Sequence, residues 1–94
     1  MMATLQSKIC IPEDVLFKEL DGEAVILNME SGKYYGLDEV GTRMWETLSQ
    51  HGQVELACQA LLEEYDVAED RLQQDLLELV DKLVSEGLLQ IDDA

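Results

Sequence analysis

Hydrophobic and polar residues alternate with the period of β-strands in the first half of the chain. Residues 15–20 are rich in strand formers, and Asp21-Gly22 follows, a dipeptide that supplies the positive φ values of a tight hairpin. Residues 24–29 form a second run, which a turn signal at residues 30–32 separates from a third run at residues 33–37. The pattern predicts a three-stranded antiparallel meander whose first and third strands are edges.

After Asp38 the hydrophobic period changes to about 3.6 residues, as in α-helices. Asp38 is suited to capping the first helix, which should end near Gly52. A second helical pattern runs from Val54 to Tyr65 and ends around Asp66. We expect the first helix to pack inward through Val40, Met44, Trp45 and Leu48.

The longest helical pattern covers residues 67–86. Asp66, followed three residues later by Glu69, resembles a capping box, and Gly87 ends the helix. The apolar residues 88–91 either cover the core or add a strand. The apolar stripe of this helix consists of Leu72, Leu76, Leu79, Val80 and Leu83, widened by Leu77 and Val84.

A chain of 94 residues fits a single domain, and no linker or internal repeat divides it. We therefore expect one domain over residues 1–94, with its core at about residues 15–91. The predicted fold class is α+β: a winged helix-turn-helix-like domain in which a three-stranded antiparallel sheet is followed by three helices.

The net charge excludes several classes of partner. The chain has 21 acidic residues against six Lys and Arg, a formal charge of −15, so it should repel a nucleic-acid backbone. No apolar run approaches the roughly 20 residues that span a bilayer, and the first residues contain no apolar signal core. We expect a cytoplasmic protein with neither nucleic acid nor membrane as a partner.

The cysteines and the histidine do not form a recognisable catalytic or metal motif. Cys10 and Cys58 are distant in sequence, and His51 has no partner at metal-ligand spacing. Scattered acidic residues are typical of solvated helix faces rather than of a calcium loop. The sequence predicts no metal, no cofactor and no enzymatic activity.

The free edge of the third strand is the best candidate for a binding surface. Residues 33–37 contain no proline, and Gly36 has no side chain to obstruct pairing with an extended peptide. Strand addition also needs pockets for alternate side chains. The third helix has more apolar residues than a small bundle must bury, which predicts a groove between this helix and the strand. The alternative is that the whole stripe is core.

Three segments resemble a known family: DGEAVILN at residues 21–28, SGKYYGLD at residues 31–38 and GTRMW at residues 41–45. Together they resemble the PqqD-like family of precursor-peptide recognition elements, over about residues 15–91. Such domains bind the leader segment of a ribosomally made peptide, present it to modifying enzymes and catalyse nothing themselves. Within the family, the chain is most similar to the free-standing leader-binding proteins of lasso peptide pathways.

The resemblance also implies partners and a site. The partners would be the leader region of a precursor peptide, a leader peptidase of the cysteine-protease kind and a peptide cyclase. The leader would pair with the third strand and lie against the third helix, with one of the two adjacent tyrosines in the groove and the other in the core. The implied residues are Tyr34, Tyr35, Gly36 and Leu37 on the strand, and Leu72, Asp75, Leu76, Leu79 and Leu83 on the helix.

Charge adds two candidates to this site. Twelve acids follow Val54, against only Arg71 and Lys82, so the helical half should attract a basic leader, unless the charge serves only solubility. Lys33 and Lys82 are the basic groups expected near the groove and are candidates to hold a leader carboxylate. Trp45 is expected to be a packing residue rather than a ligand platform.

Two other functions remain compatible with the sequence. The client enzyme of a leader-binding module can be a radical-type peptide-modifying enzyme instead of a lasso peptidase. Alternatively, the helix-turn-helix-like half of so acidic a chain can act as a regulator that binds a basic transcription factor.

Overall fold

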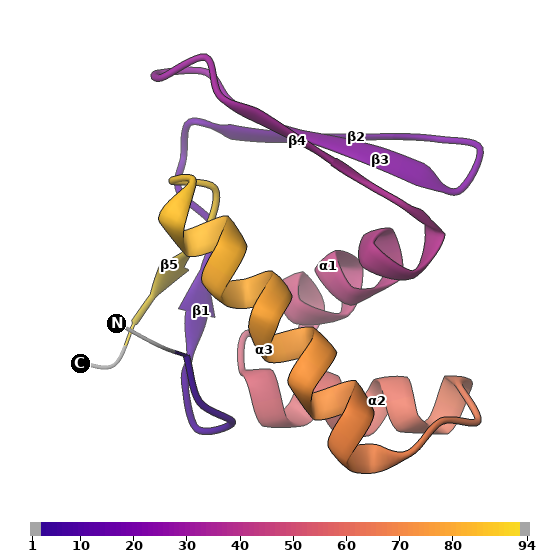
Figure 1. The fold of residues 1–94 in the computed structure, drawn as a ribbon. Coiled ribbons are helices and arrows are strands. Elements are labelled where there is room, and N and C mark those ends of the chain that lie inside the picture. Colours follow the sequence, from indigo (N-terminus) through magenta and orange to yellow (C-terminus); the bar gives the residue numbers. More distant parts are fainter. Residues whose placement is uncertain (1–2, 93–94) are drawn as a thin grey trace.

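The computed structural model describes residues 3–92 and confirms the predicted fold class. A three-stranded antiparallel sheet precedes three helices, and a short two-stranded ribbon joins the two ends of the chain (Figure 1). The sheet consists of β2 (Val15–Leu20), β3 (Glu23–Asn28) and β4 (Tyr34–Leu37). The other elements are α1 (Glu39–His51), α2 (Val54–Glu64), α3 (Glu69–Ser85) and the ribbon strands β1 (Ile9–Cys10) and β5 (Gln90–Ile91).

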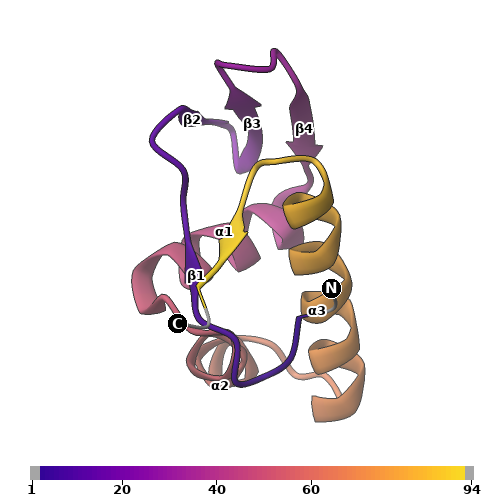
Figure 2. The same cartoon turned by 90° about the vertical axis from the view of Figure 1, so that its left-hand side faces the viewer.

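The turns of the sheet have the expected chemistry. Asp21 and Gly22 have φ values of 56° and 83°, which make the tight turn between β2 and β3. In the next turn, the side-chain oxygen of Asn28 accepts bonds from the N–H groups of Glu30 and Ser31 at 2.9 and 3.1 Å. The resulting order β2-β3-β4 leaves β4 at one edge of the sheet, above the helices (Figure 2).

The first helix is capped as predicted, whereas the third is not. Asp38 Oδ1 accepts the Gly41 N–H at 2.7 Å, and Gly52 adopts the left-handed conformation with φ 70°. The prediction that Asp66 caps α3 is wrong: the N-cap is Ala68, which has no side-chain bond, and the helix begins at Glu69. Asp66 therefore lies in the loop, two residues before the N-cap, and no side chain caps the helix there.

The inner face of the sheet and all three helices share one core. Ile26 of β3 is fully buried beneath the sheet, and Trp45 of α1 stacks on Phe17 of β2 with ring centroids 6.1 Å apart. Trp45 is thus a packing residue, as expected. Val40, which was expected to face inward, is 46% exposed because it lies at the open first turn of α1.

Residues 88–91 both cover the core and add a strand, the two roles expected as alternatives. Leu88 and Leu89 are buried in the core, and the next two residues form β5, which pairs with β1 in the register Ile9–Ile91. The N-terminal segment is fixed further by a bond of 2.7 Å from the Ala3 N–H to Asp81. Both ends of the described chain are therefore held against the helices.

The two cysteines should differ sharply in reactivity. Cys10 is exposed, whereas Cys58 is buried, and burial, together with the carboxylates of Glu69 and Glu55, raises the pKa of its thiol. We expect a thiol reagent to modify Cys10 alone in the native protein and to modify Cys58 only after unfolding, as followed by intact mass. Rapid labelling of Cys58 in the native Cys10→Ser variant, or of both thiols in the native wild type, would contradict this packing.

Candidate functional site

Every second residue of β4 bonds to β3. Asn28 N–H donates to the Lys33 carbonyl at 2.8 Å, just before β4 begins. Hydrogen-bonded pairs alternate with non-bonded pairs in an antiparallel ladder, so the β3–β4 register assigns the next bonds to Tyr35 and Leu37. The backbone groups of these two residues are therefore engaged inside the sheet.

The remaining residues of β4, Tyr34 and Gly36, direct their N–H and C=O groups away from β3. Among residues 3–92, no other strand pairs with this edge. A Cβ added at Gly36 would meet no atom within 4 Å, so the space beside the strand is open there. The edge thus offers two donors and two acceptors to an incoming strand.

A groove of about 380 Å³ lies next to this edge. Its apolar floor and its two acidic side chains come from β4 and α1, which follow each other in sequence, and from the distant helix α3. The groove is lined by Tyr35, Gly36, Leu37 and Asp38 from the end of β4, by Val40, Gly41 and Met44 from α1, and by Asp75 and Leu79 from α3. The predicted combination of strand edge and helical wall is therefore present in the structure.

Two residues of α3, Asp75 and Leu79, line the groove, and the stripe of the helix to which they belong continues beyond it. Asp75, Leu79, Lys82 and Glu86 recur at intervals of three and four residues, so they share one face. The Lys33 ammonium and the Glu86 carboxylate lie 4.0 Å apart, at the other end of β4 from Asp75. The chain runs through α3 in roughly the opposite direction to β4 (Figure 1).

The structure separates the predicted helical residues into two groups. Asp75 and Leu79 line the groove and are half-buried. Leu72, Leu76 and Leu83 do not line it: their exposed fractions are 5%, 0% and 0%, and they belong to the core. They lie on the neighbouring stripe of α3, which faces the other helices, so these three leucines support the wall from behind.

The two tyrosines have different environments. Tyr35 is half-buried, lines the groove and packs against the core. The expectation that the other tyrosine lies in the core is wrong: Tyr34 is 73% exposed, because its side chain projects from the opposite face of the sheet. Leu37 is buried beneath the sheet and contributes to the groove floor, while Lys33 lies exposed just before β4.

Sequence reasoning missed the contribution of α1 to the groove. Val40 and Met44 were assigned to the inward stripe, yet both line the groove, and Val40 remains largely exposed. Gly41 lies between them, where a Cβ would be only 3.2 Å from Asp38 Oδ1 and from Leu37. The signal was present, because a glycine and an acidic cap next to the edge strand bring α1 close to β4.

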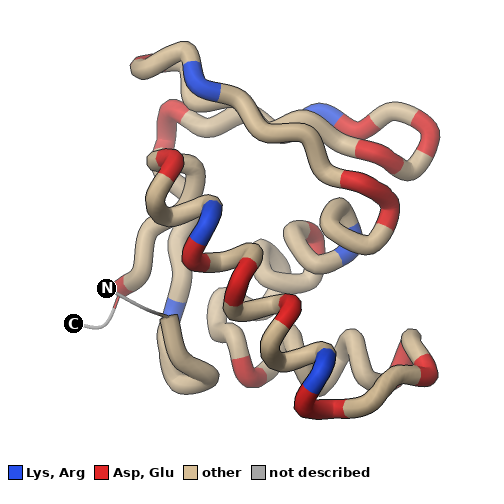
Figure 3. Tube along the Cα trace, in the orientation of Figure 1, with Lys and Arg blue, Asp and Glu red and all other residues tan. Residues whose placement is uncertain are grey.

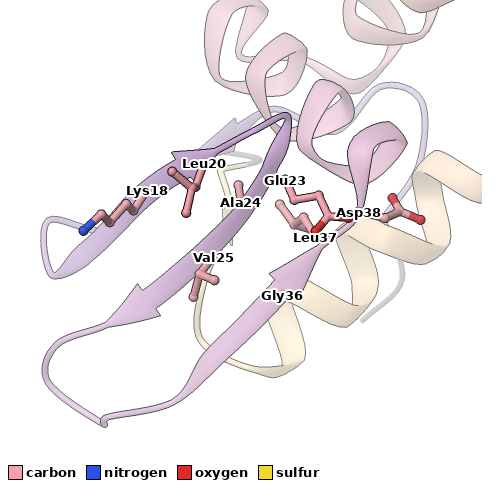
Figure 4. Close-up of a pocket in the computed structure, with 8 residues that line it drawn as sticks. All are labelled: Lys18, Leu20, Glu23, Ala24, Val25, Gly36, Leu37 and Asp38. Carbon is pink, nitrogen blue, oxygen red and sulfur yellow. The ribbon is translucent and has the colours of Figure 1, made fainter.

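The outer face of the sheet has a second hollow, of about 550 Å³, over Gly36 (Figure 4). It is lined by Lys18, Leu20, Glu23, Ala24, Val25, Gly36, Leu37 and Asp38, of which the last three also line the groove. Four exposed apolar side chains lie on this face: Leu16, Leu20, Val25 and Tyr34. A row of apolar groups on one face is typical of a protein-binding surface.

Acidic side chains dominate the helical half of the molecule (Figure 3). Arg43 of α1 is turned away from the groove, because it donates to both carboxylate oxygens of Glu64 on α2, one at 2.8 Å. This bond holds the pKa of Glu64 below its usual value. Residues 3–92 contain no group of three or more metal-ligating side chains, and none of their helices is long and apolar enough to cross a membrane.

Comparison with known proteins identifies the family. Residues 23–89 match the family described as coenzyme PQQ synthesis protein D (PqqD). Among solved structures, TbiB1 in complex with the TbiA(beta) leader peptide is 32% identical, with a TM-score of 0.79 over 85% of this chain and 93% of that one. Lasso peptide synthetase B1 complexed with its leader peptide is 22% identical and has the same fold, with a TM-score of 0.78 over 88% and 98% of the two chains. No curated protein matches. Because the family match covers most of its length, the chain belongs to the PqqD family.

Proposed function

We propose that this protein is a non-catalytic adaptor of lasso peptide biosynthesis, which captures the leader segment of a precursor peptide. The leader adds to the free edge of β4 as a fourth strand and lies against α3. The observation that carries this proposal is the unpaired edge of β4 beside an apolar groove. The similarity to TbiB1, solved with a leader peptide, supports it.

Recognition divides between backbone and side chains. Tyr34 and Gly36 supply the backbone bonds, which are indifferent to leader sequence. Alternate leader side chains then point toward the groove, where Tyr35, Val40 and Leu79 provide apolar contacts. Sequence preference therefore comes from the groove.

Fluorescence anisotropy tests leader capture directly. A labelled leader peptide from the precursor gene beside the gene of this protein is titrated with the protein at 50 mM and 300 mM NaCl. We expect saturable binding with a dissociation constant of about 0.1–10 µM that persists at the higher salt concentration, because apolar contacts and backbone bonds resist screening. A folded sample that does not bind would refute leader capture and favour a regulator that binds a basic protein.

The adaptor serves a separate leader peptidase of the cysteine-protease kind, which passes the freed core peptide to a cyclase. Holding the leader on a protein that also binds the peptidase makes the encounter with the cleavage site nearly intramolecular. This raises the effective concentration of the cleavage site without a catalytic residue in the adaptor.

We assign the outer face of the sheet to the peptidase. This face adjoins the groove through Gly36 and Asp38, so a peptidase seated on it would lie beside the bound leader. Its hollow is lined by one basic and two acidic residues, Lys18, Glu23 and Asp38, among apolar groups, whereas the helices are strongly acidic. An apolar contact area with a polar rim suits a protein partner.

Replacing Leu20 by Glu should separate capture from delivery. Leu20 is 73% exposed on the outer face and does not line the groove, so the Leu20→Glu variant should bind leader normally. We expect adaptor-dependent cleavage by the peptidase to fall about tenfold or more, measured by mass spectrometry of the cut precursor. Leu56→Glu, at an exposed leucine of α2, is the matched control and should cleave normally. Equal cleavage with both variants would show that the peptidase contacts another surface of the protein. If Leu20→Glu impaired only a different modifying enzyme, that enzyme would be the client instead of the peptidase.

A further inference from the structure

One end of the groove is acidic. Asp38 and Asp75 both line it, from the end of β4 and from α3. Asp38 uses Oδ1 to cap α1 through Gly41, which leaves Oδ2 free. The nearest positive charge is Arg71, 3.5 Å from Asp75, but its side chain is 75% exposed. An exposed pair one helical turn apart is weak, so Asp75 can exchange Arg71 for a charge on a ligand.

Beyond the groove, the surface between β4 and α3 continues to a basic end, whose side chains do not line the groove itself. Lys33 precedes β4 and its side chain is 60% exposed, with Glu86 as a distant partner at 4.0 Å. Lys82 lies between Leu79 and Glu86 on the stripe of α3 that follows β4 and forms no ion pair within residues 3–92. Two ammonium groups face the Glu86 carboxylate here, and Glu78, one turn before Lys82, accepts a bond from Gln74 Nε2 at 3.4 Å.

The other charged groups near the groove are directed elsewhere. Glu39 extends toward the hairpin at Gly22, and its Cγ lies 3.9 Å from the position that a Cβ added to Gly22 would occupy. Arg43 is bound to Glu64 on α2, and Asp81 accepts a backbone N–H of the N-terminal segment. The polarity between the two ends is therefore not cancelled by these neighbours.

We propose that this polarity selects and orients the ligand: the surface between β4 and α3 takes a strand with a basic side chain at the Asp38–Asp75 end of the groove, an apolar side chain opposite Leu79 and an acidic side chain at the Lys33–Lys82 end beyond the groove. This inference rests on the leader capture proposed above. Antiparallel pairing is the more stable arrangement. A peptide antiparallel to β4 begins at Asp38, so the order from its N-terminus is basic, apolar, acidic.

The geometry also fixes the spacing. Asp75 and Lys82 are seven residues apart on α3, a rise of about 10 Å. Asp38 and Lys33 are five residues apart along β4, a span of about 16 Å. Side chains on one face of a strand are two residues apart, about 6.6 Å, or four apart, about 13 Å. Only side chains four residues apart on the ligand strand have a separation between the span along α3 and the span along β4. This spacing gives the pattern basic-x-apolar-x-acidic.

Two unlabelled peptides of identical composition test the polarity by competition with the labelled leader. One carries Lys-Thr-Leu-Thr-Glu in a Thr and Val background, and the other has Lys and Glu exchanged. We expect the first to displace the leader at about one-tenth of the concentration needed by the second, since two weak attractions replace two weak repulsions. The ratio should shrink toward one at 0.5 M NaCl.

The double variant Asp75→Lys/Lys82→Asp reverses the polarity and leaves the net charge unchanged, so non-specific attraction stays constant. Both side chains are at least partly exposed, and circular dichroism checks the fold. We expect the preference between the two peptides to invert. Equal competition by both peptides, preference for the second in the wild type, or failure of both to displace a bound leader would overturn the polarity. Failure of the leader itself to bind would instead overturn the proposed capture.

Discussion

The Gly36→Pro variant should lose leader binding while keeping its fold. Proline removes the N–H that Gly36 directs to the free edge, and its ring occupies the space in which a paired strand must lie. Gly36 has no positive φ, and its N–H takes no part in the β3–β4 ladder, so an edge proline is compatible with the sheet. We expect the dissociation constant for the leader to rise at least about tenfold by anisotropy, because a backbone bond and its neighbours are lost together.

Two comparisons isolate the backbone effect. Gly36→Ala adds a Cβ that meets no atom within 4 Å and retains the N–H, so this variant should bind leader within about twofold of the wild type. Tyr35→Pro removes an N–H engaged with β3 and should lower the melting temperature as well as binding. Normal leader binding by folded Gly36→Pro would refute strand addition at β4.

The Leu76→Ala variant should lose much of the stability of the protein. Leu76 is fully buried among the three helices, and truncating such a leucine costs about 2–5 kcal/mol in free energy of unfolding. A small domain has only about 5–15 kcal/mol in total. Urea denaturation followed by circular dichroism measures the change, and a loss below about 1 kcal/mol would contradict the packing of α3.

Leu79→Ala is the matched variant on the same helix. Leu79 lies three residues further along α3 but is half-buried in the groove wall. Its truncation should cost less stability than that of Leu76 and should weaken leader binding severalfold, since apolar contact with the ligand is removed. The two leucines thus distinguish support of the fold from contact with the leader.

Much of the sheet could be predicted from the sequence because its signals are local. An Asp-Gly pair forces a tight turn, alternation fixes which residues share a face, and Asp38 caps the helix that follows. The groove could be predicted in the same way, because the sequence shows an edge strand without proline and a third helix with more apolar residues than a small bundle must bury. These features depend on a few neighbouring residues.

The sequence alone does not determine which leucines of α3 face the core and which face the groove. Leu76 and Leu79 are three residues apart, and both belong to the broad apolar stripe that the sequence predicts. Which of them faces the core depends on the rotation of the helix, which packing against the other helices sets. The predicted start of α3 was wrong for a related reason. Asp66 and Glu69 have the spacing of a capping box, but the loop after α2 extends to Ala68, so the helix begins only at Glu69. The β1–β5 pairing joins residues about 80 positions apart, so no local pattern indicates it.

This pairing has a consequence for how the domain can be built into larger proteins. Ile9 and Ile91 are direct partners in the ribbon, so segments from near the two ends of the described chain lie side by side. Neither ribbon strand lines the groove or the outer hollow. The domain can therefore be inserted into a loop of an enzyme, fused at either end or circularly permuted without touching its binding surfaces. Covalent fusion to a leader-processing enzyme would replace the docking of two separate proteins by a tether.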